Sequence, residues 1–140
     1  MSIFASSRFL PRVMWADAAS CAATGALQLL AARPLAAVTG LPLALLTGTG
    51  VFLLVYAVLA AVIARRQPLP RTLVGLIALG NLGWALGCAL LIFGSGLALS
   101  GWGVAWVAAQ ALVVIVLADL QWLGLRSTRN RAHQSLQAAA

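Results

Sequence analysis

Apolar residues dominate four long stretches of the chain, and short segments rich in arginine, glycine or proline separate them. A helix needs roughly 20 apolar residues to cross a hydrocarbon core of about 30 Å, and each stretch is long enough. The pattern predicts an all-α, single membrane domain over residues 13–125, arranged as an up-down bundle of four helices. The expected helices cover residues 13–32, 43–64, 72–93 and 102–125.

The segments outside these stretches have their own characters. Residues 1–12 mix apolar side chains with serine and arginine, so we expect an arm that lies at the membrane interface. Arg33-Pro34 is expected to end the first helix, because proline disfavours helical geometry in the residue before it. Residues 35–42 are expected to form a short connection, and residues 126–140 a basic, polar and mobile tail.

The basic residues indicate an orientation. All nine are arginines, and eight of them lie in the N-terminal arm, in the loop after the second stretch or in the tail, whereas Arg33 lies on the opposite side. Basic residues accumulate on the cytoplasmic side of a membrane, so both termini are predicted to be cytoplasmic. Trp15 and Trp122 then fall near the inner interface, and Trp102 and Trp106 near the outer one, as in an aromatic belt.

Composition places the chain in a membrane. It has 63% hydrophobic and 8% charged residues, whereas a soluble domain carries about 25% charged residues. The net charge of +7 does not indicate nucleic-acid binding, because the arginines flank the apolar stretches and do not line one face. We expect contact with membrane lipids and no nucleic-acid partner. Arginine without lysine, and aspartate without glutamate, is typical of a GC-rich bacterial genome. The expected location is therefore the bacterial inner membrane, which the chain crosses several times.

A polar stripe follows one face of the first helix. Its members are Asp17, Ser20, Thr24 and Gln28, with Cys21 and Gly25 on the same face. Asp17 and Gln28 differ by only about 20° around the helix axis. Polar side chains in hydrocarbon face the bundle interior or a wet cavity. We favour helix packing with a few interhelical hydrogen bonds, and the alternative is the lining of a transport pathway.

The two acidic residues, Asp17 and Asp119, are expected at one depth, a turn or two inside the inner boundary. A buried carboxylate without a partner is unfavourable, so we expect each to be an interfacial anchor paired with arginine. The arginines near this level are Arg12, Arg65, Arg66 and Arg126. The alternative is a site that responds to protons or cations.

The third helix has two distinct faces. Gly80, Gly83 and Gly87 lie within about 60° of arc, and Gly83 and Gly87 form a GxxxG motif, which permits close approach of another helix. Asn81 and Trp84 lie on the second face. We interpret this face as bundle core with a satisfied polar pair, and the alternative is the floor of a ligand pocket.

Several polar groups need partners inside the membrane. Asn81 is expected to hydrogen-bond Gln110, or alternatively Thr49 or Tyr56 of the second helix. In the fourth helix Gln110 and Gln121 share a face, and Asp119 lies about 180° from Gln110. This helix therefore has polar contacts on two sides, one for its own bundle and one for a partner. The two cysteines, Cys21 and Cys88, differ in depth by roughly 10–15 Å, which is too far for a disulfide.

The sequence shows no catalytic signature. It has no histidine in a predicted span, no CxxC pair, no glutamate, no phosphate-binding loop and no nucleophile elbow. We predict no catalytic residue, no cofactor and no metal site. The favoured function is a non-enzymatic accessory or scaffold subunit that packs against a second copy of itself or a larger membrane complex. The alternatives are a small transporter or channel that uses the polar stripe, and a lipid- or quinone-linked enzyme that uses Asp17, Asp119 and Trp84.

Three segments carry a resemblance to a group of proteins. They are Trp15-Ala16-Asp17-Ala18, Asn81-Leu82-Gly83-Trp84 and Ala118-Asp119-Leu120-Gln121-Trp122-Leu123-Gly124-Leu125-Arg126. With these segments the chain resembles small, uncharacterised bacterial inner-membrane proteins with four transmembrane helices. The resemblance implies a four-helix membrane fold and no activity. Small multidrug exporters are less similar, because they rely on a mid-membrane glutamate in the first helix that this chain lacks.

Overall fold

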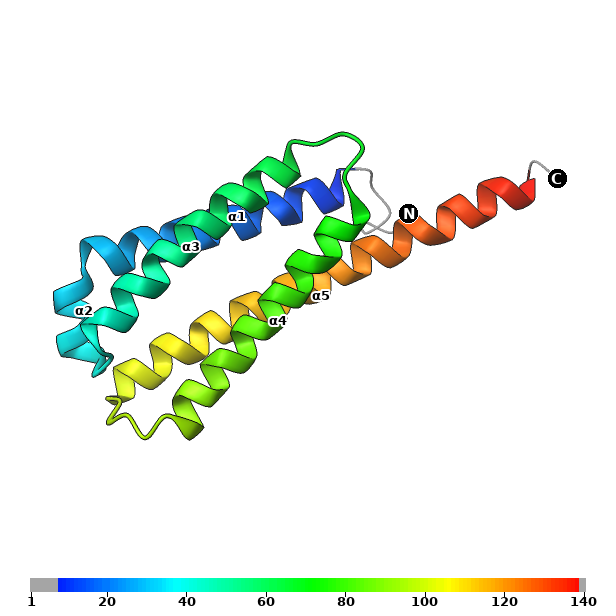
Figure 1. Cartoon of the computed structure of the whole chain (residues 1–140). Coiled ribbons are helices and arrows are strands. Elements are labelled where there is room, and N and C mark those ends of the chain that lie inside the picture. The colour runs from blue at the N-terminus through cyan, green and yellow to red at the C-terminus, as the bar shows by residue number, and fades with distance from the viewer. Residues whose placement is uncertain (1–7, 139–140) are drawn as a thin grey trace.

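The protein is all-α, as predicted, but it contains five helices (Figure 1). The computed structural model describes the backbone of residues 8–138 and the side chains of residues 8–127. The helices are α1 (Phe9–Leu30), α2 (Ala32–Thr39), α3 (Leu43–Ala64), α4 (Arg71–Gly94) and α5 (Gly101–Ala138). The long helices run up and down, in agreement with the predicted topology.

The long helices form two hairpins. α1 packs along α3, and α4 packs along α5, whereas α3 and α4 touch only weakly although they follow one another in the chain (Figure 1). α1 also contacts α5, and α2 contacts both α3 and α5. The hairpins are therefore joined along the α1–α5 side and at the α2 end, and they are separated between α3 and α4.

Prolines mark the starts of the two central helices. Pro42 is the N-cap of α3 and Pro70 is the N-cap of α4, and both have non-helical ψ angles. Proline is suited to a helix start because its missing N–H would have no intrahelical partner there. α3 has the bounds expected from the sequence, and α4 extends one residue beyond them at each end.

The expected connection after the first helix is instead a helix. α1 ends at Leu30, and α2 leaves it at an angle of 89°. Arg33 and Pro34 lie in the first turn of α2, where proline is tolerated, so they begin the second helix and do not end the first. Gly40 caps α2 in the left-handed conformation, with φ 75°, which glycine adopts at little steric cost.

The expected tail continues the last helix. α5 runs to Ala138 and does not end near residue 125, and Figure 1 shows its C-terminal part projecting beyond the other helices. Of the expected N-terminal arm, residues 9–12 form the first turn of α1, and residues 1–7 lie outside the described residues.

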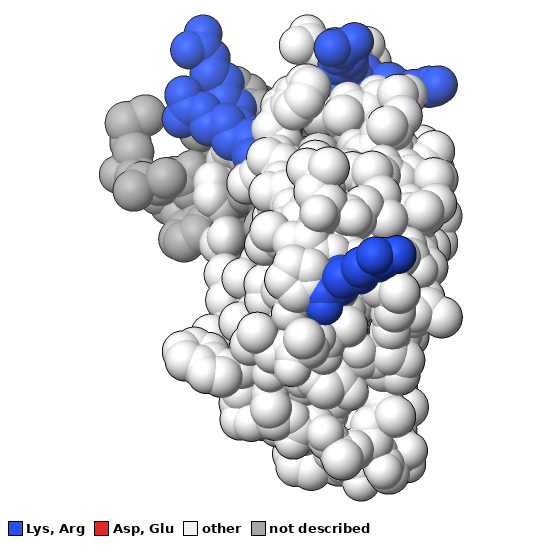
Figure 2. Space-filling view, turned by 90° about the vertical axis from the view of Figure 1, so that its left-hand side faces the viewer, with Lys and Arg blue, Asp and Glu red and all other residues white. Residues whose placement is uncertain are grey.

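The helices identify a multi-pass membrane protein. α3, α4 and the Gly101–Ser127 part of α5 are each long and apolar enough to cross a membrane, and α1 with α2 adds a fourth candidate span if the bent pair is one span. Large apolar side chains such as Leu86, Leu90 and Phe93 are exposed on the surface, which is suited to contact with lipid. Seen from the α2 end, the surface shows basic side chains only at separate places (Figure 2).

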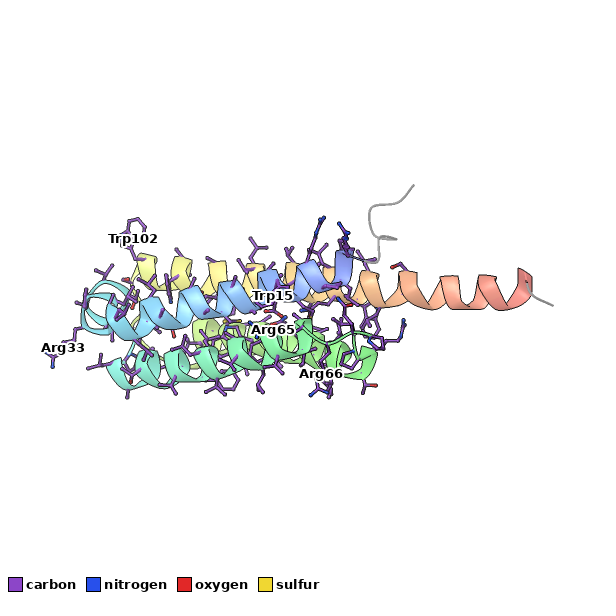
Figure 3. The ribbon with its side chains drawn as sticks, turned by 90° about the horizontal axis from the view of Figure 1, so that it is seen from above. Trp15, Arg33, Arg65, Arg66 and Trp102 are labelled. Carbon is purple, nitrogen blue, oxygen red and sulfur yellow. The ribbon has the colours of Figure 1, made fainter. Side chains whose placement is uncertain are left out.

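The two ends of the bundle differ. Arg33 and Trp102 lie at the α2 end, whereas Arg65 and Arg66 lie toward the opposite end, which we call the Arg65 end (Figure 3). The Arg65 guanidinium lies 5.9 Å from the centroid of the Trp15 ring, a cation–π distance. On α5 the Arg126 guanidinium lies 5.7 Å from the Trp122 ring in the same way.

Candidate functional site

A cluster of polar side chains joins α1, α4 and α5 in the interior. Asp17 and Gln121 are 0% exposed and Asn81 is 2% exposed. Asn81 Nδ2 donates to Asp17 Oδ2 at 2.9 Å, and Gln121 Nε2 donates to the same oxygen at 2.7 Å. Asn81 Nδ2 also lies 3.3 Å from Gln121 Oε1. Asn81 and Gln121 follow Asp17 by 64 and 104 residues along the chain. The cluster thus links the two hairpins.

Further residues complete this polar cluster. The Cys21 thiol lies 3.6 Å from Asp17 Oδ1, one turn along α1. The Tyr56 hydroxyl, from α3, lies 3.1 Å from the Ile77 carbonyl oxygen and 3.3 Å from Asn81 Oδ1. All four long helices therefore contribute a side chain.

The expected pairing of Asp17 with arginine is wrong. The carboxyl group is held by two amides and a thiol, and no arginine of the described part of the chain is among its hydrogen-bond partners. Arg12 is exposed, and Arg65 lies over the Trp15 ring. Arginine side chains near a helix end extend toward the aqueous interface, whereas neutral amides enter the apolar interior at a smaller desolvation penalty. Sequence depth alone could not distinguish these two kinds of partner.

The polar stripe of α1 divides between different partners. Ser20 Oγ donates to the Asp17 carbonyl oxygen of its own helix at 2.9 Å, and Thr24 is half-buried. Gln28 is 2% exposed and accepts a hydrogen bond of 2.9 Å from Thr49 Oγ1 of α3. The Asp17 end of the stripe therefore contacts α4 and α5, and the Gln28 end contacts α3.

Asp119, the other aspartate, lies apart from this cluster. Asp119 is exposed on α5, so the structure places the two aspartates in opposite environments.

Asn81 does not bond Gln110. Its partners are Tyr56, which was one of the expected alternatives, and Asp17 and Gln121, which were not. In the sequence Asp17 lies close to Trp15, and Gln121 is next to Trp122. Because both tryptophans are expected in the same aromatic belt, this was the available signal that Asp17 and Gln121 share a depth.

The predicted glycine face is open within this chain. A Cβ atom added to Gly83 or Gly87 would meet no atom within 4 Å, and one added to Gly80 would meet only the Tyr56 ring and hydroxyl. The close helix approach occurs elsewhere: a Cβ at Gly25 would lie 2.8 Å from the Gly50 carbonyl oxygen. Helix α1 therefore packs on α3 through glycine, and the α4 glycines border an open space.

That space is a cavity between the two hairpins. It has a volume of about 520 Å³, and it lies between α3 and α4 with contributions from α1 and α5. Phe52, Gly83 and Gly87 line it and are also exposed on the outer surface, so the cavity opens to the surface between α3 and α4. We call it the α3–α4 crevice.

Aromatic rings border the crevice. Phe52 of α3 and Trp84 of α4 are stacked, with centroids 5.7 Å apart and planes 3° apart. Tyr56 also stacks on Phe52, with centroids 6.2 Å apart and planes 27° apart. Trp84 thus lines the crevice.

The crevice also contains polar groups. Cys21, Tyr56 and Asn81 line the crevice where it borders the polar cluster, to which they belong. Gln110 of α5 lines it too, and makes no hydrogen bond within the described part of the chain. Trp106, one turn from Gln110, lines it as well, and its buried Nε1 atom has no acceptor among the described residues. Sequence reasoning missed Trp106, although its spacing of four from Gln110 is a usable signal.

A second, shallow pocket lies at the Arg65 end. Its volume is about 500 Å³, and Arg71, Thr72, Trp122, Leu125 and Arg126 line it. Arg71 Nη2 donates to the Leu125 carbonyl oxygen at 2.7 Å, which holds the start of α4 against α5. The guanidinium groups of Arg71 and Arg126 make this second pocket a basic surface at the end of the apolar part of α5.

The chemistry of the described residues is that of a polar cluster beside an apolar crevice. Cys21 and Cys88 are both free and buried, and no three His, Cys, Asp or Glu side chains within the described residues are grouped as metal ligands would be. Comparison with known proteins adds no relative: no family model, no curated protein and no solved structure matches this chain.

Proposed function

We propose that the chain is a non-enzymatic, multi-pass protein of the bacterial inner membrane that binds a lipid-soluble molecule in the α3–α4 crevice. The observation that carries the proposal is a cavity of about 520 Å³ between apolar helices of membrane-crossing length. Ligand sites usually have volumes of about 300–1,000 Å³ and mostly apolar walls with a few polar groups. The opening beside Phe52 faces lipid, so a ligand dissolved in the bilayer would enter sideways.

The arrangement of the polar cluster supports ligand binding in this crevice more than a catalysed reaction. Asp17 is the nearest carboxyl group, and it is 0% exposed behind Asn81 and Cys21, which line the crevice. Its oxygens are occupied by donors from three side chains. We therefore assign the cluster to holding the two hairpins together beside the ligand.

We further propose that both termini are cytoplasmic and that α1 with α2 forms a fourth span. The uneven distribution of the arginines supports this orientation, because eight of nine lie on the predicted cytoplasmic segments. The stacking of Arg65 on Trp15 and of Arg126 on Trp122 agrees with an interface at the Arg65 end.

Reporter fusions test this orientation. Fusions after Gln67 and Gln134 are expected to report the cytoplasm, and a fusion after Gly96 the exterior. A reporter at the N-terminus separates four spans from three, because it is cytoplasmic only if α1 and α2 cross the membrane together. An exterior signal at the N-terminus would reject the fourth span.

A second candidate is an accessory or scaffold subunit, and the length of α5 favours it. Its 38 residues span about 57 Å, well beyond a hydrocarbon core of about 30 Å. Residues after Asp119 include Arg126, Arg129 and Arg131 and no acid, so an acidic cytoplasmic surface of a partner subunit would complement them. Truncation after Ser127 is expected to abolish co-purification of that partner, and recovery of the same proteins with the truncated chain would reject this function.

The transport alternative has weaker support. A pathway along the polar stripe requires water at Asp17 and Gln28, which are 0% and 2% exposed. Cysteines at positions 17, 20, 24 and 28, introduced without the native cysteines, would report this directly. Labelling by a water-soluble thiol reagent at all four positions would favour transport over packing.

The crevice is tested by filling it. Gly83→Leu places a side chain where a Cβ would meet nothing within 4 Å, so the fold is expected to persist while the crevice is occupied. Gly48→Leu is the matched control, because Gly48 has equally free surroundings but does not line the crevice. Mass spectrometry of organic extracts from the purified proteins should find a lipid-soluble molecule with the wild type and Gly48→Leu, and a reduced amount with Gly83→Leu. Equal extracts from all three proteins would reject the proposed function.

A further inference from the structure

Two polar groups on one face of α5 lie at the crevice without partners. Gln110 and Trp106 are one helical turn apart, and both side chains line the cavity. The Gln110 side chain makes no hydrogen bond with any described residue, and Trp106 Nε1 is buried without an acceptor among them. Gln110 lies about 14 Å along α5 from its first residue, well inside a core of about 30 Å.

Such groups are unusual at this depth. Hydrocarbon offers no hydrogen bond, so an amide inside a membrane is expected to bond another group, and a buried indole N–H usually has an acceptor. The inner end of the same crevice shows the usual situation, because Asn81 and Tyr56 are bonded within the polar cluster. Trp106 Nε1 and the Gln110 side chain, by contrast, have no such partner among the described residues.

The unpaired donors outnumber the acceptors. The Gln110 amide offers two N–H groups and one carbonyl oxygen, and the Trp106 indole offers one N–H and no acceptor. A ligand that satisfies them must supply an acceptor. The lining also includes flat surfaces: the rings of Phe52 and Trp84 are parallel, and Gly83 and Gly87 present no side chain on α4.

We infer that the α3–α4 crevice binds a planar, lipid-soluble carbonyl compound whose oxygen accepts a hydrogen bond from the Gln110 side chain, with Trp106 as the neighbouring donor. This inference rests on the proposed function and specifies its ligand class. The ring system lies along the glycine face of α4, and the carbonyl group points toward α5.

Fluorenone and fluorene test the inference, because they share a planar ring system and differ in one carbonyl oxygen. Binding is measured by calorimetry with the protein in dodecyl maltoside micelles, and the heat of empty micelles is subtracted. The wild type is expected to bind fluorenone about twofold to tenfold more tightly than fluorene, the gain typical of one neutral hydrogen bond. Gln110→Leu should remove this preference and leave fluorene binding unchanged.

Tryptophan variants provide an independent readout. The Nε1–H nuclear magnetic resonance signal of Trp106, assigned with Trp106→Phe, should shift with fluorenone and not with fluorene. Trp102→Phe is the matched control, because Trp102 lies one turn earlier on α5, is 74% exposed and does not line the crevice. The Trp102→Phe variant should prefer fluorenone over fluorene by the same factor in affinity as the wild type.

The outcomes separate the two proposals. Equal affinity of the wild type for both compounds, or a preference that Gln110→Leu retains, overturns the inference while crevice binding stands. Retention of a phospholipid that fluorenone does not displace also overturns it, because a lipid ester would then be the occupant. If wild type and Gly83→Leu bind neither compound, the inference fails, and the extracts described above decide the proposed function separately.

Discussion

The polar cluster and the α3–α4 crevice are adjacent, but they are built in opposite ways. In the polar cluster Asp17, Asn81 and Gln121 are at most 2% exposed, and each has hydrogen-bond partners from other helices. In the crevice the Gln110 side chain has no partner among the described residues, and α3 and α4 touch only weakly, through the stacked rings of Phe52 and Trp84 and the Tyr56 hydroxyl. Satisfied polar groups fix one arrangement of helices, whereas unsatisfied groups beside a cavity indicate that something else completes them.

The largest expected effect comes from removing the centre of the polar cluster. Asp17→Leu deletes the acceptor of Gln121 Nε2 and of one Asn81 hydrogen bond, and leaves buried donors unpaired. We expect a loss of about 2–4 kcal/mol in the free energy of unfolding, measured by denaturant titration in detergent. Asp17→Asn should lose less, because its amide oxygen still accepts from both donors.

The matched control is the same change at the other aspartate. The Asp119 side chain is exposed and makes no hydrogen bond or ion pair with the described residues, so Asp119→Leu should leave the unfolding midpoint unchanged. Equal losses of unfolding free energy in Asp17→Leu and Asp119→Leu would contradict the contrast between a buried, hydrogen-bonded aspartate and an exposed one.

Glycine substitutions compare the packed and the open sides of the molecule. Gly25→Ala places a Cβ 2.8 Å from the Gly50 carbonyl oxygen and 3.1 Å from Leu53 Cβ, so α1 and α3 must separate. The expected loss is about 1–3 kcal/mol. Gly87→Ala has free space and should be neutral, or stabilising by roughly 0.5–1 kcal/mol through helix propensity. A larger loss at Gly87 would indicate that its face packs against another chain.

The smallest expected effect concerns the hydrogen bond between α1 and α3. Thr49 Oγ1 donates to Gln28 Oε1, whereas Thr47 bonds only carbonyl oxygens of its own helix, Leu43 and Ala44. Thr49→Val should destabilise the protein by about 0.6 kcal/mol more than Thr47→Val in the same titration, since interhelical hydrogen bonds in membranes average that value. No difference would show that this bond contributes nothing to the stability of the hairpin.

The helices were predicted more reliably than their ends. Four apolar stretches defined α1, α3, α4 and the first part of α5, because a length of about 20 apolar residues is a strong signal. The α2 helix was missed because its eight residues carry no such signal, and Arg33-Pro34 fits a helix start as well as a helix end. The continuation of α5 was missed because polar composition suggests a tail and does not exclude a helix.

The partners inside the membrane needed the tertiary structure. The sequence placed Asp17, Asn81, Gln121 and Gln110 on helix faces and at depths, and it indicated that polar groups there seek partners. It did not distinguish arginine from amide as the partner of Asp17, or Gln110 from Gln121 as a partner of Asn81. Those choices depend on how the helices are rotated and which pairs lie side by side.

The sequence by itself determined that this is an all-α, multi-pass membrane protein, because helix length and apolar composition are local properties that hydrocarbon selects directly. Only the tertiary structure decided that α1 packs on α3 and α4 on α5, that Asp17 is enclosed while Asp119 is exposed, and that a crevice separates α3 from α4. Inside a membrane every helix is apolar on most sides. The pairing of helices therefore follows from glycine contacts and a few polar groups, whose partners are distant in the chain.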